Sequence, residues 1–288
     1  MEKKTIRTAV INDLSGLGRC SLTADIAVLS AMGIQACPMP TAILSAQTGF
    51  PAYSFLDMKS EMSSYIRKWK ELDVRFDGIL TGFLTGDEEA SLVQSFLREF
   101  RTENTKLLVD PVMADGGRGY ANFTTGLRRN LRALAGEADV VTPNVTELFF
   151  LADLPCREKD LLSPDPAELA DLARSMMDRS GQLWVVTGLP FRDQIGNLLV
   201  TEQAEELISS PRYGKNFSGS GDLLAASLFG SLLLGVKPRE AIEMTNAFIS
   251  AAASSAVHKN FQSNDGLDFE PYLSMLNGGN YYEKESED

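Results

Sequence analysis

Residues 217–226 read FSGSGDLLAA, a glycine-rich turn that runs directly into a strongly apolar helical segment. Gly219 and Gly221 allow backbone N–H groups to converge on one point, and the N-terminus of the following helix adds positive potential there. Such a turn can hold a phosphate or a developing negative charge. Asp222 would lie in the first helical turn, where its carboxylate can accept a proton from a bound hydroxyl group. The same residues also fit an ordinary N-cap behind a flexible loop, so this segment alone leaves both interpretations open.

Two further segments place acidic residues next to a glycine-rich loop and a helix start. Residues 110–120 read DPVMADGGRGY, in which Asp110 ends an apolar strand and precedes a loop that could fold over a ligand. Residues 142–148 read TPNVTEL, in which Asn144 and Glu147 share one face of the helix that begins there. Together with Asp110 they could hold a hydrated Mg²⁺. Asn144 and Glu147 also match a capping box, which requires no ligand.

Short apolar runs alternate with longer helical segments along the chain. The short runs predict strands over 5–11, 34–39, 78–81, 106–109, 139–142 and 183–187, with 195–201 and 206–209 as an antiparallel pair. Apolar residues three and four apart predict helices over 21–32, 55–69, 88–100, 125–135, 166–180, 221–234 and 238–259. The alternation predicts an α/β fold with a mostly parallel sheet covered on both faces. No repeat or flexible linker interrupts it, so we expect one domain over residues 1–288, with a frayed tail at 279–288.

Polar and glycine residues follow the predicted strands at the point where each strand ends. In chain order they are Asn12 and Asp13, Thr41, Gly82, Asp110, Thr142 with Asn144, and Thr187 with Gly188. Each of them could be only a turn residue. Parallel sheets carry their ligand sites beyond the carboxyl ends of the strands, so the accumulation of these residues at one edge predicts a site there.

The composition excludes several classes of protein. The net charge is −12, and no basic stripe is present that could neutralise the phosphates of a nucleic acid. No apolar run approaches the roughly 18 residues of a membrane span, and no signal-peptide apolar region is visible. The three cysteines form no C-x-x-C pair and are expected to be reduced, as in a cytoplasmic protein. The single histidine, His258, excludes a two-histidine zinc site within one chain, so a catalytic base is expected to be a carboxylate.

Two common nucleotide-binding motifs are missing or incomplete. The chain contains no GxxxxGK[ST] sequence, so a P-loop ATPase is not expected. Residues 15–21 read SGLGRCS and approach the dinucleotide fingerprint, but no acid ends the second predicted strand to hold a ribose. An NAD site is therefore not expected either.

Taken together, these segments resemble the motifs of the ribokinase-like superfamily and, within it, of the pyridoxal kinases. Residues 110–113 (DPVM) resemble the family's strand end, and 142–148 (TPNVTEL) resemble its TPNxxEL motif. Residues 219–222 (GSGD) resemble its GTGD turn, and 79–84 (ILTGFL) resemble its substrate-side SGYL segment. The four motifs occur in the family's order, and the resemblance covers nearly the whole chain.

The resemblance implies a three-layer α/β/α sandwich with antiparallel edge strands, and ATP-dependent phosphorylation of a hydroxymethyl group. By this resemblance Asp222 is the general base, and the turn of Gly219, Ser220 and Gly221 stabilises the transferring phosphoryl group. The implied ATP-binding residues are Asp110, Thr142, Asn144, Glu147, Thr187 and Gly188, with Asp110 and Glu147 placing Mg²⁺. The implied substrate-binding residues are Asn12, Asp13, Gln47, Thr48 and Phe83. The implied lid comprises Gly116, Gly117, Arg118 and Gly119. A homodimer is also implied, and the use of a monovalent cation stays open.

The substrate is identified by fewer residues than the reaction. Ala46 and Gln47 stand where pyridoxal kinases often have Asn-His, and this pair is closer to the hydroxymethylpyrimidine kinases. The lysine that pyridoxal kinases carry near Thr187 is also missing. In contrast, Gly49-Phe50 and the turn at 18–21 (GRCS) are closer to the pyridoxal kinases.

We therefore expect the substrate to be a B6 vitamer, namely pyridoxal, pyridoxamine or pyridoxine. Hydroxymethylpyrimidine is the alternative substrate. A catalytically silent ligand-binding protein is the alternative class, and the presence of Asp222 argues against it.

Overall fold

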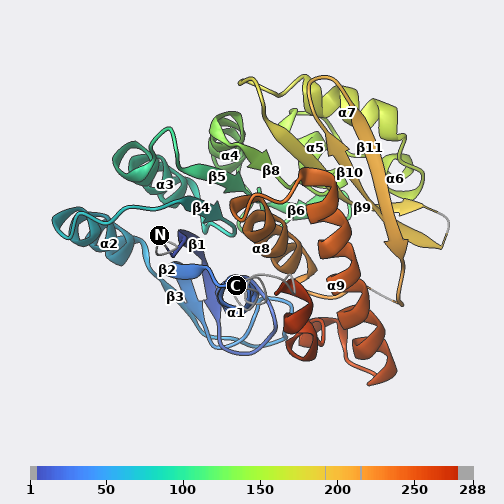
Figure 1. Cartoon of the computed structure of the whole chain (residues 1–288), viewed down its shortest axis with the longest axis horizontal. Helices are drawn as coiled ribbons and strands as arrows, with labels where there is room; N and C mark the ends of the chain where they lie inside the picture. The colour runs from blue at the N-terminus through green and yellow to red at the C-terminus, as the bar shows by residue number, and fades with distance from the viewer. Residues whose placement is uncertain (1–4, 192, 215, 278–288) are drawn as a thin grey trace, which may run out of the picture.

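One mixed sheet of nine strands organises the chain (Figure 1). The computed structural model describes residues 5–191, 193–214 and 216–277. The strands of the sheet are β1 (Arg7–Ser15), β2 (Gln35–Leu44), β3 (Phe55–Asp57), β4 (Gly78–Thr81), β5 (Lys106–Val109), β8 (Val140–Val141), β9 (Leu183–Phe191), β10 (Gln194–Val200) and β11 (Glu205–Pro211). They follow the order β11-β10-β9-β8-β5-β4-β1-β2-β3. The strands from β9 to β2 run parallel, while β3 at one end and β10 and β11 at the other are antiparallel. The predicted sheet is confirmed.

Helices cover both faces of this sheet (Figure 1). They are α1 (Ser21–Ala31), α2 (Lys59–Glu71), α3 (Asp87–Phe100), α4 (Thr125–Glu137), α5 (Val145–Leu151), α6 (Glu158–Leu162), α7 (Pro166–Arg174), α8 (Ser220–Leu233) and α9 (Pro238–His258), followed by the short 3-10 helices η1 (Ser263–Asp265) and η2 (Glu270–Leu276). One apolar core contains side chains of α2 to α7, and the other contains side chains of α1, α8, α9 and η2. The three-layer α/β/α arrangement is therefore confirmed.

Neighbouring residues on the central strands face opposite cores. Ile79 and Leu107 point to the α2–α7 side, whereas Leu80 and Leu108 point to the α1–α8 side. All four side chains are buried. Because successive strand residues alternate between the two faces and both faces are covered, every position can be apolar. This explains why the central strands appear in the sequence as continuous apolar runs.

The structure differs from the helix expected over 55–69. Phe55–Asp57 instead forms the edge strand β3, which pairs with residues 42–44 of β2, and α2 begins only at Lys59. The Asp57 side chain accepts a hydrogen bond from the Lys59 backbone N–H, which separates the strand from the helix. Phe55 and Leu56 are exposed, so the apolar spacing that suggested one long helix belongs to two elements. The helix prediction was wrong over residues 55–58.

Further boundaries differ from the prediction. β1, expected over 5–11, runs from Arg7 to Ser15 and so includes Asn12 and Asp13. β2 runs to Leu44 because residues 42–44 pair with β3, and β9 continues through Gly188 to Phe191 because β10 pairs with it along this length. The helix expected over 166–180 ends at Arg174. The tail predicted to fray, 279–288, lies outside the described residues. Within the described ranges, no helix is both long and apolar enough to cross a membrane.

We expect Leu108→Ala to lower the free energy of unfolding by about 2–5 kcal/mol, because Leu108 is fully buried at the centre of the sheet. Urea denaturation monitored by circular dichroism measures this change. The matched control is Leu72→Ala, at a side chain that is 72% exposed, and it should change stability by less than about 0.5 kcal/mol. Equal losses in the two variants would contradict the placement of β5 at the centre of the core.

Candidate active site

A cavity of about 910 Å³ opens along the edge of the sheet where the parallel strands end. Most residues predicted from the sequence line it: Asp13, Gln47, Thr48, Phe83, Asp110, Thr142, Asn144, Glu147, Thr187, Gly188, Gly219, Ser220, Gly221 and Asp222. They come from segments as far apart in sequence as β1 and α8. The fold thus brings together the residues that the sequence placed at strand ends.

The turn before α8 depends on glycine at position 219. Gly219 is the N-cap of α8, with φ +80°, a conformation that L-residues rarely adopt. A Cβ at this position would lie 2.0 Å from the backbone carbonyl oxygen of Arg19, so the two chain segments can approach only at a glycine. The first N–H groups of α8 have no acceptor within the helix. Because Ser220 and Gly221 line the cavity, these donors are placed at its wall.

Asp222 lies in the first turn of α8 and is held by Asn12. The Asn12 Nδ2 atom donates to Asp222 Oδ1 at 3.1 Å. Burial raises the pKa of the Asp222 carboxyl to about 6, with Asp13 contributing repulsion, while hydrogen bonds from the Ser21 backbone and from Asn12 oppose the rise. A carboxylate with this pKa is ionised at neutral pH and basic enough to accept a proton.

Asn12, predicted to contact the substrate, is instead buried beneath the site. Its Oδ1 atom accepts the backbone N–H groups of Asp13 at 3.0 Å and Phe83 at 2.9 Å. Its Nδ2 atom donates to Asp25 Oδ2 at 2.9 Å as well as to Asp222. Gly82 makes room for this amide, since a Cβ at Gly82 would lie 2.5 Å from Asn12 Nδ2. Asn12 therefore orients Asp222 rather than forming a wall of the cavity.

Asp110 faces the same cavity from the end of β5. Its Oδ1 atom accepts a hydrogen bond from the Thr142 hydroxyl at 3.0 Å. Its Oδ2 atom faces Gly221, where a Cβ would lie 3.9 Å away. Burial and the nearby Asp222 raise the pKa of Asp110 to about 7. Asp110 thus leaves one carboxylate oxygen directed toward the turn that begins α8.

Glu147 and Asn144 form the capping box that the sequence offered as an alternative. The Asn144 side chain accepts the Glu147 N–H at 2.9 Å, and Glu147 Oε2 accepts the Asn144 N–H at 2.9 Å. Glu147 Oε1 accepts the Met113 N–H at 3.1 Å. Burial, followed by the charge of Asp110, raises the pKa of Glu147 well above its usual value. Both oxygens of Glu147 already accept a backbone hydrogen bond, so Glu147 is better suited to bind a metal-bound water than the ion itself.

These carboxylates fit a hydrated Mg²⁺ but not a metal site built from protein alone. No three His, Cys, Asp or Glu side chains among residues 5–191, 193–214 and 216–277 lie close enough together to enclose an ion. Mg²⁺ is usually held by one or two carboxylates, by waters and by phosphate oxygens of the substrate. Asp110 could supply one such carboxylate ligand, and Glu147 could bind a water molecule attached to the ion.

The Gln47 amide is used inside the protein. Its Oε1 atom accepts the Gly49 N–H at 2.7 Å, and its Nε2 atom donates to Ser218 Oγ at 3.3 Å and to the Asn264 carbonyl at 3.3 Å. Gln47 is buried, whereas its neighbour Thr48 is exposed to the cavity. Gln47 therefore links the loop at 47–49 to the turn before α8.

The residues predicted as a lid form a tight β-hairpin. β6 (Ala114–Asp115) pairs with β7 (Arg118–Gly119), and the two turn residues Gly116 and Gly117 have φ +58° and +78°. Two successive positive φ angles are typical of a type I′ hairpin turn. Gly117 N–H donates to the Thr146 hydroxyl at 3.0 Å. The hairpin leads directly to Tyr120, which lines the cavity. Its closure over a ligand stays a prediction.

Several residues at the site were not predicted from the sequence. Asp25 lies beneath it, Tyr53 and Tyr120 line it, and Asn197 donates to Asn246 Oδ1 at 2.7 Å on the β10–α9 side. Asp25 had a usable signal, because it is the only charged residue in an otherwise apolar or small-residue helix, α1. The Asn197–Asn246 pair had none, since it joins residues 49 positions apart.

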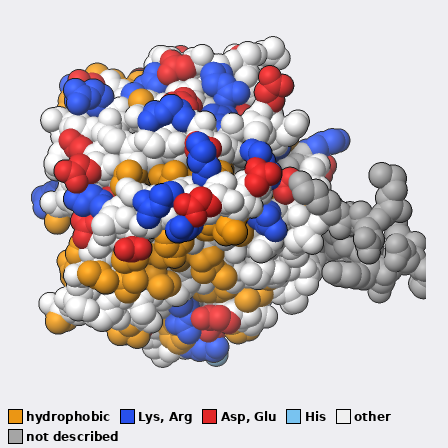
Figure 2. Space-filling view, turned by 90° about the vertical axis from the view of Figure 1, so that its left-hand side faces the viewer, with side chains coloured by type: hydrophobic (Ala, Val, Ile, Leu, Met, Phe, Trp, Pro, Cys, Tyr) orange, Lys and Arg blue, Asp and Glu red, His pale blue; other side chains and the backbone are white. Residues whose placement is uncertain are grey.

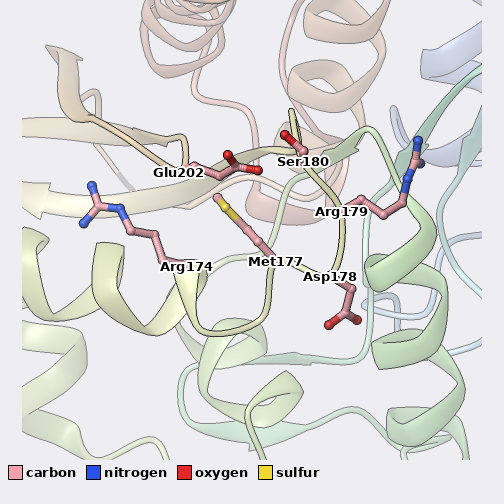
Figure 3. A pocket seen from close by; sticks show the side chains of 6 residues that line it. All are labelled: Arg174, Met177, Asp178, Arg179, Ser180 and Glu202. Atoms are coloured by element: carbon pink, nitrogen blue, oxygen red, sulfur yellow. The ribbon is translucent and has the colours of Figure 1, made fainter.

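A second pocket, of about 340 Å³, lies near the amino end of β9, away from this cavity (Figure 3). Three of its four charged side chains form ion pairs within the protein, and the fourth, Glu202, accepts the Gly181 N–H at 3.1 Å. Arg174 contacts Asp171 and Glu205, Asp178 contacts Arg132, and Arg179 contacts Asp139. These pairs leave the pocket without an evident ligand-binding group.

Comparison with known proteins agrees with this geometry. A family model described as phosphomethylpyrimidine kinase matches residues 18–266. A Bacteroides thetaiotaomicron protein assigned to the phosphomethylpyrimidine kinases is 33% identical, covers 96% of this chain and 95% of its own, and has a TM-score of 0.87. An orthorhombic crystal form of that protein was solved with pyridoxal, and it matches with a TM-score of 0.85.

Two of the curated relatives are kinases that differ in the substrate they are named for. The pyridoxal kinase PdxY of Rubrobacter xylanophilus is 27% identical over 253 residues, which are 84% of each chain. The hydroxymethylpyrimidine/phosphomethylpyrimidine kinase of Rhizobium meliloti is 25% identical over 256 residues, covering 86% of this chain and 92% of its own. Both names describe kinases of small ring compounds. The two relatives therefore agree in the type of reaction and differ in the ring of the substrate.

Gly219→Ala should destabilise the protein more than a glycine substitution that creates the same backbone strain without the steric clash. Gly235 provides the control, since it has φ +85° and a Cβ there would meet nothing within 4 Å. We expect Gly235→Ala to cost about 1–2 kcal/mol and Gly219→Ala at least about 2 kcal/mol more, because Arg19 must move. Urea denaturation measures both values. Similar losses would show that the close approach at Gly219 is not a constraint.

Proposed function

The chain belongs to the phosphomethylpyrimidine kinase family, and on that premise we propose that it is a pyridoxal kinase, which transfers the γ-phosphoryl group of ATP to the hydroxymethyl group of a B6 vitamer. The observation that carries the proposal is the position of Asp222 in the first turn of α8, beside the Gly219–Gly221 turn and in the wall of one cavity. A general base and a set of convergent N–H donors are what phosphoryl transfer requires of the protein.

The residues at this site suggest a simple sequence of events. The hydroxymethyl oxygen of the vitamer attacks the γ-phosphorus, and its proton passes to the Asp222 carboxylate. The bond from the γ-phosphorus to the oxygen of the departing ADP breaks as the new P–O bond forms. The first N–H groups of α8 stabilise the charge on the transferring group, because they are fixed before the reaction begins. Asp222 later releases the proton to solvent.

Three observations favour a B6 vitamer over hydroxymethylpyrimidine. The Bacteroides protein, which was crystallised with pyridoxal, resembles this chain over nearly its whole length. In addition, an aminopyrimidine would use Gln47 as a partner for its amino group, but both ends of the Gln47 amide are engaged within the protein. Asp13 and Thr48 line the cavity and could pair with the ring nitrogen and phenolic oxygen of a pyridine. Hydroxymethylpyrimidine kinase activity stays the alternative, in line with the Rhizobium relative.

The proposal includes several finer features. ATP would lie against Asp110, Thr142, Thr187 and Gly188, with Mg²⁺ between Asp110 and the phosphates. The hairpin at 114–119 would shield the phosphates as a lid. We also propose that the chain acts as one kinase domain in the cytoplasm, where its cysteines, free in the structure, stay reduced.

We further propose that the protein forms a homodimer through the side of the molecule that carries β3. Figure 2 shows hydrophobic side chains gathered on this side. On the paired strands β2 and β3, the exposed members are Ile43 and Leu56, which lie opposite each other. β3 is an edge strand, so its free edge together with these side chains offers a surface for a second copy.

Asp222→Asn keeps the shape of the side chain but removes its basicity, so kcat should fall by about 10²–10⁴-fold with the fold intact. In the wild type, Asp222 must be ionised to accept the proton, and its pKa is about 6. The rate should therefore decrease as the pH falls through about 6. Asp110, with a pKa of about 7, interacts with Asp222, so the observed limb reports the two together. Turnover measured from pH 5 to 8 tests both statements, and near-normal turnover of Asp222→Asn would exclude the role.

Asp110→Asn should raise the Mg²⁺ concentration needed for half-maximal activity by about tenfold or more, because one charged ligand is lost. The KM for the vitamer should change little, since Asp110 lies on the phosphate side. Mg²⁺ titrations at saturating ATP measure the shift. An unchanged Mg²⁺ requirement would argue that Asp110 does not place the ion.

A substrate panel of pyridoxal, pyridoxamine, pyridoxine and hydroxymethylpyrimidine with Mg-ATP tests the choice of ring. We expect a clear preference for pyridoxal or pyridoxamine, because a site that pairs the polar groups of a ligand can reject an analogue that lacks them by up to about 10⁴-fold. The measurement is kcat/KM for each compound. A higher value for hydroxymethylpyrimidine than for every B6 vitamer would overturn the substrate and leave the kinase reaction standing.

A further inference from the structure

A buried carboxyl that the proposed reaction does not use lies directly behind the general base. Asp25, on α1, is only 1% exposed and does not line the cavity. Its Oδ2 atom accepts a hydrogen bond from Asn12 Nδ2 at 2.9 Å. Its Oδ1 atom has no hydrogen-bond partner among the described residues. A buried polar atom without a partner costs stability, so its presence calls for an explanation.

The Asn12 amide can adopt only one orientation between its neighbours. Its Oδ1 atom accepts two backbone N–H groups, from Asp13 and Phe83, which it could not do with its nitrogen. Its Nδ2 atom must then supply both N–H bonds to the other side, one to Asp25 and one to Asp222. With all four bonds made, the direction of the bond to Asp222 Oδ1 is fixed.

We propose that Asp25 is a positioning residue for the general base: it holds the Asn12 amide so that the second N–H of Asn12 fixes Asp222 Oδ1. This role rests on the proposed kinase function. Asp25 itself touches neither substrate nor nucleotide. It positions Asp222 through Asn12, so its contribution is to the rate and not to the binding of either ligand.

An apolar side chain at position 25 would be the better choice for stability alone. The neighbouring residues on α1, among them Leu22, Leu29 and Val28, are fully buried in the core between α1 and α8. Replacing a buried charged group by a well-packed apolar one is often neutral or stabilising. Asp25 also faces Asp222 on α8, Asp110 after β5 and Asp13 on β1, and burial together with these charges raises its pKa well above the usual value. A carboxyl kept under such conditions indicates a function that outweighs its cost.

The experiment compares Asp25→Ala, which removes the acceptor, with Asp25→Asn, which keeps a side-chain oxygen at the same place. The control is Ser231→Ala, a buried polar residue of α8 whose hydroxyl donates to the Ser227 carbonyl oxygen of the same helix. Each variant is assayed for kcat, for the KM of ATP and of the phosphoryl acceptor, and for the pH dependence of the rate. The acceptor is whichever compound of the substrate panel the wild type phosphorylates.

We expect Asp25→Ala to lower kcat by about 10–100-fold, while both KM values stay within about threefold. Asp25→Asn should recover most of the rate, to within about fivefold of the wild type. Ser231→Ala should leave kcat and the pH profile unchanged. If Asp25→Ala, once folded, turns over as fast as the wild type, or if Asp25→Asn is as slow as Asp25→Ala, the inference is wrong.

A second measurement does not depend on activity. The side-chain NH₂ resonances of Asn12 in a ¹⁵N-labelled protein should exchange slowly with solvent in the wild type and in Asp25→Asn, and quickly in Asp25→Ala. Equal exchange in all three proteins would overturn the inference even if every protein were inactive. A wild type that phosphorylates no compound of the panel would overturn the proposed function, and the amide exchange would still decide the role of Asp25.

Discussion

The active edge depends on the close approach of two backbone segments, at Gly219 and Arg19. A Cβ at Gly219 would lie 2.0 Å from the Arg19 carbonyl oxygen, so α8 can begin against the β1–α1 turn only with glycine there. The backbone at Arg19 is held in place by its own side chain, which donates hydrogen bonds to Glu270 Oε1 at 2.7 Å and to the Asp265 carbonyl oxygen at 3.2 Å. This contact brings the first turn of α8 to the end of β1, and only then can Asn12 reach Asp222.

The same approach concentrates negative charge in a protected space. Asp13, Asp25, Asp110, Glu147 and Asp222 all have raised pKa values, and burial is the largest cause for each of them. A site of this kind would repel a nucleotide by itself. Positive charge from the N–H groups of α8 and from a magnesium ion would allow ATP to bind beside the four of these carboxyl groups that line the cavity. The acidity of the site therefore supports a metal-nucleotide complex, rather than free nucleotide, as the ligand.

The sequence predicted the sheet, its parallel core and the edge that carries the site, because these follow from local signals: buried runs, helix periodicity and polar residues at strand ends. It did not predict β3, because Phe55 and Leu56 gain a strand partner only when residues 42–44 arrive beside them. It assigned Gln47 and Asn12 to the substrate, whereas their amides bond to residues up to 217 positions away. Such pairs depend on the tertiary structure, and no pattern in the neighbouring sequence encodes them.

The turn at 263–264 has a consequence for how the two ligands influence one another. Ser263 accepts the Ser218 N–H at 2.9 Å, Asn264 donates to the Gly49 carbonyl at 2.6 Å, and Gln47 closes the circuit through Ser218. The loop at 47–49 and the approach to α8 are thus fastened to one short segment near the end of the chain. A molecule that immobilises either part reduces the conformational entropy that the other part loses when it binds its own ligand. Each ligand would therefore raise the binding affinity of the other by an equal factor.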